Sequence, residues 1–164
     1  MTNTFWKKKE GGHGDHYQTP IDYLKIIDKF IPKDIKVNDP FYASGLVKTY
    51  WKELGREIIH NDSDFFTEDF STTDYIISNP PFSKIADILT HLFIINKPFS
   101  LLIPLQKIAQ VKIQRILKGK NIQVIISDCY KGFLTPEGEA TRCSSMYMCW
   151  ACYKMDLDKD LIFL

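Results

Sequence analysis

Tyr75-Ile76-Ile77-Ser78-Asn79-Pro80-Pro81-Phe82-Ser83 is the stretch of sequence that decides the fold. Residues 75–78 are predicted to form a short buried strand. The two prolines end it, because they donate no backbone hydrogen bond and have a fixed φ. The chain then leaves the strand along one rigid, extended path. Asn79 is therefore expected at the end of a strand, in the crevice where open α/β sheets bind ligands.

The groups expected at this strand end suit a planar ring that carries an amino group. The side chain of Asn79 and the main chains of Asn79 and Pro80 offer acceptors for N–H bonds, and Phe82 offers an aromatic face. The same letters also fit a plain strand and turn, with Phe82 packed into the core.

Asn79-Pro80-Pro81-Phe82 after a hydrophobic strand resembles the catalytic motif of S-adenosylmethionine-dependent methyltransferases that modify the exocyclic amine of adenine. The resemblance implies that these four residues form the catalytic site. Asn79 and the Pro80 carbonyl would hold the amine, and Phe82 would stack on the base. The motif occurs in DNA and RNA methyltransferases alike, so the implied partner is either nucleic acid, single-stranded or with the target base flipped out.

Three further segments resemble the cofactor-binding parts of this family. In the first, Tyr17-Gln18-Thr19-Pro20, Thr19 is expected to cap a helix that Pro20 begins, and apolar residues follow at helical spacing up to Ile31. The family has an aromatic-Gln-Thr-Pro segment beside the methionine part of S-adenosylmethionine. The resemblance implies that role for Tyr17, Thr19 and Pro20.

The second segment is Asp39-Pro40-Phe41-Tyr42-Ala43-Ser44-Gly45, between a predicted strand at 35–38 and a predicted helix at 46–54. Strand, tight turn and helix form the layout that brings backbone N–H groups to a cofactor. The segment resembles the Asp-Pro-Phe-x-Gly-Ser-Gly cofactor loop, which implies binding roles for Asp39, Pro40, Phe41 and Gly45. Ala43 stands where a glycine is usual. Its Cβ restricts φ, so an altered loop is one expected consequence.

The third segment follows a brief strand predicted at 57–60. An acid just beyond the second strand of such a fold grips the ribose hydroxyls of a nucleoside cofactor, and Asp62 is the candidate. Asp64 and Phe65 resemble the acid and aromatic that hold the cofactor's adenine. The division of roles between the two acids stays open, and a solvated acidic loop is the alternative. The stretch from Asp62 to the strand at 75–78 is too short for the usual helix and strand, so this sheet edge is expected to be trimmed.

The rest of the chain alternates between helical and strand patterns. A helical pattern begins at Ile85 and lasts until Lys97-Pro98, and a second helix is predicted at 105–117. Strands are predicted at 100–103 and 122–126, and a loop at 128–142 leads to a returning antiparallel strand at 145–153. The predicted fold is a three-layer α/β, Rossmann-like methyltransferase domain. Its sheet is mostly parallel, with a C-terminal antiparallel hairpin strand. It is expected to span 17–155, between a flexible basic arm at 1–16 and a C-terminal tail at 156–164.

Composition narrows the class of protein but not its partner. The 164 residues carry a net charge of +1 and 45% hydrophobic residues, as expected of one globular domain. A near-neutral total argues neither for nor against nucleic acid. No apolar run is long enough for a membrane span, and the N-terminus does not resemble a secretory signal. We therefore expect an intracellular protein, cytoplasmic or nuclear, that does not bind a membrane.

The cysteines and histidines do not predict a metal site. Cys149 and Cys152 have the spacing of a metal knuckle but fall in a predicted strand, where residues three apart point to opposite faces. His13 and His16 lie in a glycine-rich lead-in and are taken as incidental.

The sequence therefore predicts transfer of a methyl group from S-adenosylmethionine to N6 of adenine in DNA or RNA. Transfer to a guanine amine or a glutamine amide is the alternative within the enzyme class. An inactive binding subunit that kept the fold is the alternative outside it. Because little of the chain remains once the fold is built, we expect low sequence specificity or a partner subunit that supplies recognition.

Overall fold

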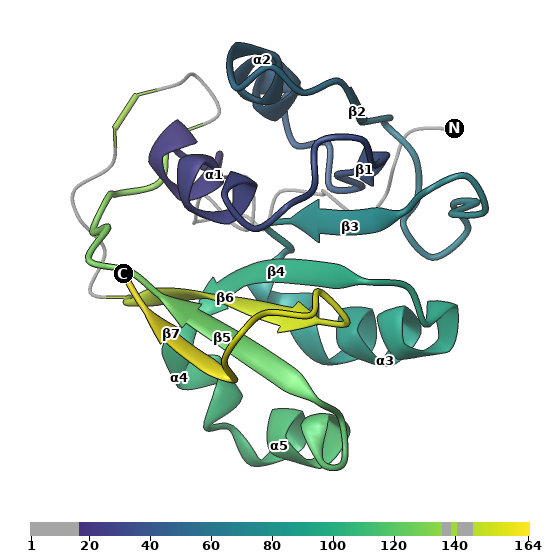
Figure 1. Cartoon of the computed structure of the whole chain (residues 1–164), viewed down its shortest axis with the longest axis vertical. Helices are drawn as coiled ribbons and strands as arrows, with labels where there is room; N and C mark the ends of the chain where they lie inside the picture. Colours follow the sequence, from purple (N-terminus) through teal and green to yellow (C-terminus); the bar gives the residue numbers. More distant parts are fainter. Residues whose placement is uncertain (1–16, 136–138, 141–145) are drawn as a thin grey trace, which may run out of the picture.

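The computed structural model describes residues 17–135, 139–140 and 146–164, so the arm predicted at 1–16 lies outside the described residues. Within them the chain forms one sheet with the strand order β2-β1-β3-β4-β6-β5-β7 (Figure 1). The strands are β1 (Val37–Asn38), β2 (Ile58–Ile59), β3 (Tyr75–Ser78), β4 (Phe99–Pro104), β5 (Ile122–Ile126), β6 (Met148–Tyr153) and β7 (Leu161–Phe163).

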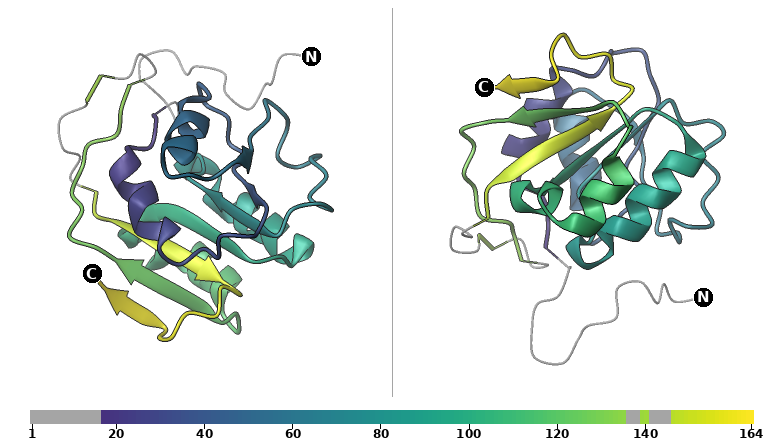
Figure 2. Two further views of the ribbon diagram at one scale, coloured as in Figure 1. Left: turned by 45° about the horizontal axis from the view of Figure 1, so that its top comes forward. Right: turned by 90° about the horizontal axis from the view of Figure 1, so that it is seen from below.

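All neighbouring strands pair in parallel except where β6 runs back between β4 and β5. Helices cover both faces of the sheet, with α1 and α2 on one and α3, α4 and α5 on the other (Figures 1 and 2). Their bounds are α1 (Ile21–Asp28), α2 (Leu46–Glu53), α3 (Ile85–Ile95), α4 (Leu105–Ile108) and α5 (Val111–Leu117). The predicted three-layer fold, with its antiparallel strand, is confirmed.

The hydrophobic core has two halves because successive strand residues point to opposite faces. Ile77 and Cys152 pack with the α1 and α2 side, whereas Ile76 and Cys149 pack with the α3 and α5 side. The two cysteines therefore face away from each other, as predicted. No group of three or more metal-ligating side chains comes together in the described part of the chain.

Three details differ from the sequence prediction. The helix expected at 105–117 is two helices, because Gln110 has an extended ψ of 133° between α4 and α5. The basic residues of that segment therefore do not share one helix face. Thr19 makes no capping hydrogen bond, and α1 begins at Ile21 instead of Pro20. The tail expected at 156–164 contains β7, which extends the sheet beside β5.

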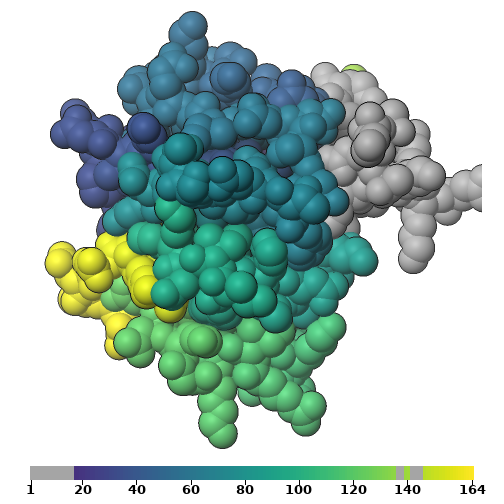
Figure 3. Space-filling model, turned by 90° about the vertical axis from the view of Figure 1, so that its right-hand side faces the viewer, coloured from purple at the N-terminus to yellow at the C-terminus, as the bar shows by residue number. Residues whose placement is uncertain are grey.

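The sheet edge beyond β1 is trimmed, as predicted. Residues 60–74 contain no helix or strand. Glu68 instead ties this loop to the sheet by accepting hydrogen bonds from Asn38 Nδ2 (2.8 Å) and Ser63 Oγ (2.9 Å). Phe65 and Phe66 each place a ring against His91 of α3. Figure 3 views the molecule from the side on which this loop (blue to teal) lies above α3 and α5 (green).

The helices of the described residues are short. None combines the length and apolar character required to cross a bilayer.

Candidate functional site

A row of buried polar side chains crosses the sheet where three parallel strands end. Because β2, β1 and β3 are neighbours and run in the same direction, their carboxyl ends bring His60, Asp39 and Ser78 to one edge. All three residues are at most 3% exposed. Buried polar groups are costly unless they are hydrogen-bonded, so the partners of this row define what the edge can still bind.

Asp39, predicted to bind the cofactor, lies at the centre of the row with its carboxylate turned inward. Ser78 Oγ donates a hydrogen bond to Asp39 Oδ1, which joins the end of β3 to the end of β1. Burial raises the pKa of the Asp39 carboxyl, against smaller opposing effects of His60 and of the Ser78 hydrogen bond. The carboxyl thus fixes the two strand ends to each other.

His60 is a site residue that sequence reasoning missed. Its Nδ1 lies 2.6 Å from the carbonyl oxygen of Asp39, and a carbonyl can only accept, so Nδ1 carries the proton. In the neutral ring Nε2 is then an acceptor. It is buried and has no hydrogen-bond partner among the described residues. The Tyr42 ring stacks on His60 at 4.8 Å between centroids. The sequence held one signal for His60, namely its position directly after the strand β2.

Asn79 directly follows β3, as predicted. Its side-chain oxygen Oδ1 is buried and has no hydrogen-bond partner within the described chain. Pro80 and Pro81 are buried behind it, and Pro81 is extended at φ −61° and ψ 119°. A single 3₁₀ turn, Phe82–Lys84, then leads into α3. The motif therefore presents one acceptor that the fold itself leaves unsatisfied.

Phe82, three residues after Asn79, is half-buried, so part of its surface stays exposed. Its ring meets the ring of Phe133 edge-on at 6.0 Å, and Phe133 in turn stacks on Tyr23 of α1 at 5.9 Å. Phe133 is a second residue that sequence reasoning missed, because it lies in a loop far along the chain from the motif. It fixes the orientation of Phe82.

The predicted cofactor loop keeps a glycine-like backbone at Ala43. Ala43 has φ +48° and Gly45 has φ +79°, both in the left-handed region that favours glycine. A Cβ on Gly45 would lie 2.7 Å from the Tyr42 hydroxyl, so no larger residue fits there without a shift. Pro40 and Phe41 are buried behind the loop. Ala43 therefore adopts a left-handed conformation that is strained for a residue with a Cβ.

The segment at 17–20 lies against the loop that carries Phe133. Gln18 and Leu134 exchange two backbone hydrogen bonds of 2.8 and 3.0 Å. Thr19 and Pro20 are buried, and Tyr17 is half-buried. The structure thus brings the segment at 17–20 and Phe82 of the predicted catalytic motif to the same loop, and the contacts of 17–20 with a cofactor stay a prediction.

The third segment is arranged differently from its neighbours. Asp62 and Asp64 are exposed, and Asp64 Oδ1 accepts the Phe66 N–H at 3.0 Å within its own turn. Phe65 is 2% exposed and packs on Phe41 at 4.9 Å, inside the core. Through this contact the Phe65 ring packs against the predicted cofactor loop at 39–45. The roles predicted for these three residues remain predictions.

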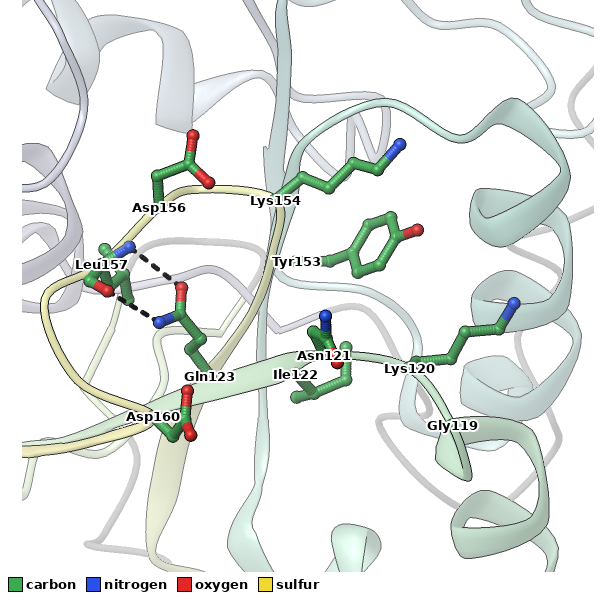
Figure 4. A pocket seen from close by; sticks show the side chains of 10 residues that line it. All are labelled: Gly119, Lys120, Asn121, Ile122, Gln123, Tyr153, Lys154, Asp156, Leu157 and Asp160. Carbon is green, nitrogen blue, oxygen red and sulfur yellow. Dashed lines mark hydrogen bonds between the residues drawn. The ribbon is translucent and has the colours of Figure 1, made fainter.

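A hollow of about 790 Å³ lies at the amino ends of the parallel strands, opposite to the ends that carry His60, Asp39 and Asn79 (Figure 4). It is lined where β5 begins and β6 ends, by residues that include Lys120, Gln123, Tyr153, Lys154 and Asp156. None of the residues predicted for the site lines it.

Comparison with known proteins yields likeness in structure alone. No family model matches the chain, and no curated protein matches it. A protein of Listeria monocytogenes described as a class I S-adenosylmethionine-dependent methyltransferase aligns with a TM-score of 0.51 at 12% identity, covering 94% of this chain and 67% of that one. Precorrin-6y C5,15-methyltransferase of Geobacter metallireducens aligns with a TM-score of 0.54 at 9% identity, covering 94% and 97%. The chain therefore shares the Rossmann-like fold of these two methyltransferases.

Proposed function

We propose that the protein transfers a methyl group from S-adenosylmethionine to the exocyclic N6 amine of adenine in DNA or RNA. One observation carries the proposal. Asn79 Oδ1 is a buried acceptor without a partner in the described chain, and it stands at the carboxyl end of β3, directly before Pro80-Pro81-Phe82. An unsatisfied buried acceptor costs about 1–3 kcal/mol, which an N–H donor from a bound substrate would recover.

The residues at the strand ends fit the cofactor. His60 Nε2 is a second buried acceptor without a described partner, and Gly45 leaves the start of α2 free of a side chain. Asp39, the loop up to Gly45 and the segment at 17–20 would hold S-adenosylmethionine, as would Asp62, Asp64 and Phe65 by the family resemblance. When bound, the cofactor supplies an activated methyl group. Both structural neighbours are described as methyltransferases, which supports this choice.

The protein's own residues then act on the amine. Asn79 Oδ1 and the Pro80 carbonyl accept its two N–H bonds, which draws the nitrogen lone pair out of conjugation with the ring. The same oxygens stabilise the positive charge that develops on the nitrogen. Phe82 stacks on the base, and its contact with Phe133 fixes the plane of the ring. Preorganised partners of this kind contribute about 10²–10³ in rate.

The target base must be unpaired to enter such a site. We therefore propose that the substrate is single-stranded or that the target base is extruded from a duplex. We also propose that a partner subunit can supply recognition of the target.

The test is incubation with labelled S-adenosylmethionine and separate pools of DNA, RNA and protein, followed by nucleoside and amino-acid analysis. Label recovered as N6-methyladenine is the expected result. Label recovered as a methylated guanine amine or glutamine amide would replace the proposal with one of the alternatives. Cofactor binding without transfer to any pool would favour an inactive binding subunit.

A further inference from the structure

Two exposed tyrosines lie together at the carboxyl edge of the sheet. Tyr147 is 68% exposed and Tyr130 is 42% exposed, and their ring centroids are 5.5 Å apart with planes tilted by 36°. Tyrosine rings usually bury most of their surface and leave only the hydroxyl in water. A tyrosine pair with this much ring surface in solvent offers that surface to a partner.

The tyrosine pair stands on the same edge as Asn79. Tyr147 directly precedes β6, whose first residue, Met148, pairs with Pro104 at the end of β4. The backbone carbonyl of Tyr147 accepts a hydrogen bond from the Leu105 N–H at 2.8 Å. Tyr130 follows the end of β5, in the segment that runs from β5 toward α1 (green in Figure 1). Ser78 pairs with Leu101, three residues before β4 ends at Pro104, so the tyrosine pair lies on the same side of the sheet as Asn79, at the carboxyl ends of the strands, but beyond the end of β3.

The residues that directly follow Tyr130 and lead to Phe133 are held in place by several contacts. The Tyr23 hydroxyl donates to the Lys131 carbonyl (3.2 Å) and accepts from the Lys131 N–H (3.4 Å). Two residues later, Phe133 contacts Phe82. A platform held in this way is ordered before a ligand arrives, so binding costs less conformational entropy.

Charge near the tyrosine pair is of both signs. Lys131 is the neighbour of Tyr130, and Lys107 lies in α4 shortly after Leu105. The carboxylates of Asp22 and Asp128 lie close enough to Cys129 to raise its pKa, together with the larger effect of burial. Because these charges are mixed in sign, we expect the tyrosine pair to contact a nucleic acid mainly through its rings and only weakly through phosphate groups.

We propose that the tyrosine pair is a stacking platform for an unpaired base next to the target base on the same nucleic-acid strand. The inference rests on the proposed function and names the residues that would recognise the strand. A base extruded into the site leaves its neighbours without a stacking partner, and an exposed aromatic face supplies one to any base. Such recognition tolerates different sequences and requires no additional domain.

The experiment measures binding of labelled single-stranded DNA and RNA oligonucleotides by fluorescence anisotropy across a salt series. We compare the wild type with Tyr147→Ala and Tyr147→Phe. The matched control is Ile94→Ala, which removes an equally exposed apolar residue (74%) from the far end of α3. Thermal unfolding and calorimetry with S-adenosylmethionine verify that the fold and the cofactor site are unchanged.

We expect Tyr147→Ala to weaken binding at least about fivefold, the lower end of base–aromatic stacking. Tyr147→Phe keeps the ring and should bind within about twofold of the wild type, as should Ile94→Ala. The slope of log affinity against log salt should not change in Tyr147→Ala, because no phosphate contact is removed.

Wild-type affinity in Tyr147→Ala would overturn the inference, while methyl transfer to adenine by the same protein would leave the proposed function in place. Equal losses in Tyr147→Phe and Tyr147→Ala would overturn it too, since the hydroxyl would then be the contact. Loss of self-association in Tyr147→Ala, measured by sedimentation, with unchanged oligonucleotide binding would assign the surface to a second copy of the chain. If the wild type bound and methylated no nucleic acid, the proposed function and this inference would fall together.

Discussion

The two ends of the parallel strands, called here the carboxyl edge and the amino edge of the sheet, differ in whether their polar groups have hydrogen-bond partners. At the carboxyl edge, Asn79 Oδ1 and His60 Nε2 are buried and have no partner among the described residues. At the amino edge, the hollow of about 790 Å³ is lined mostly by polar side chains that are exposed to water, among them Lys120, Asp156 and Asp160 (Figure 4). Gln123 alone makes three hydrogen bonds, two to Leu157 and one to the Lys159 carbonyl.

The difference shows that the hollow at the amino edge offers a ligand less than its volume alone suggests. A hollow whose donors and acceptors are exposed to water gives a ligand little to gain, because each new hydrogen bond must replace a hydrogen bond to water. The buried, unsatisfied acceptors of the carboxyl edge, in contrast, gain a hydrogen bond with every donor that enters. We therefore propose that the site lies at the carboxyl edge.

The largest expected effect separates the two edges by activity. Asn79→Ala should lower methyl transfer about a hundredfold or more, the scale for losing one preorganised partner of a transition state. Cofactor affinity and the unfolding temperature should stay close to the wild-type values. Gln123→Ala, the control in the hollow, should leave transfer unchanged. Rates measured with each purified variant check this, and equal activity of Asn79→Ala and wild type would refute the assignment of the site.

The second effect concerns stability. Ser78→Ala removes the hydrogen bond to the buried Asp39 carboxyl and should lower the free energy of unfolding by about 1–3 kcal/mol. Lys154→Ala in the hollow removes two exposed bonds to Asn96 and should change it by less than about 0.5 kcal/mol. Urea unfolding measures both. A larger loss in Lys154→Ala would reverse the comparison.

The third prediction is a pH dependence. Burial raises the pKa of Asp39 above 3.8, so its contribution to stability is complete below that pH and is lost as pH rises through the folded-state value. The free energy of unfolding of the wild type, minus that of Asp39→Asn, should therefore fall as pH rises from 3.8. Asp69 is the matched control, because hydrogen bonds from Ser71 lower its pKa and reverse the sign. Denaturant titrations at several pH values measure both differences, and a flat difference for Asp39→Asn would contradict the buried carboxyl.

The smallest effect tests the left-handed residues of the two edges. Ala43 at the site and Lys154 at the hollow have φ of +48° and +53°. Ala43→Gly relieves strain of about 1–2 kcal/mol and adds unfolded-state entropy, so a net gain of at most about 1 kcal/mol is expected. Lys154→Gly should gain less, because it also loses the bonds to Asn96. Unfolding curves compare the two, and a destabilised Ala43→Gly would mean that the alanine side chain itself is needed in the loop.

Much of this fold was predictable because its signals are local. The strand at 75–78 and its abrupt end follow from a short, mostly apolar run that two prolines stop after Asn79, and the structure has the same bounds. The trimmed edge followed from the short chain between Asp62 and that strand. The break between α4 and α5 was not predictable from periodicity, because the apolar spacing continues through Gln110 while its backbone is extended.

The sequence by itself determined the order of the elements, the place of Asn79 at a strand end and the turn chemistry around it. Hydrophobic period and proline act on neighbouring residues, so they can be read along the chain. Only the tertiary structure decided that Ser78 bonds to Asp39, that His60 joins them, and that Phe133 holds Phe82. These contacts join residues far apart in sequence, and they form because parallel strands in a particular order end at one edge. No local pattern encodes that order.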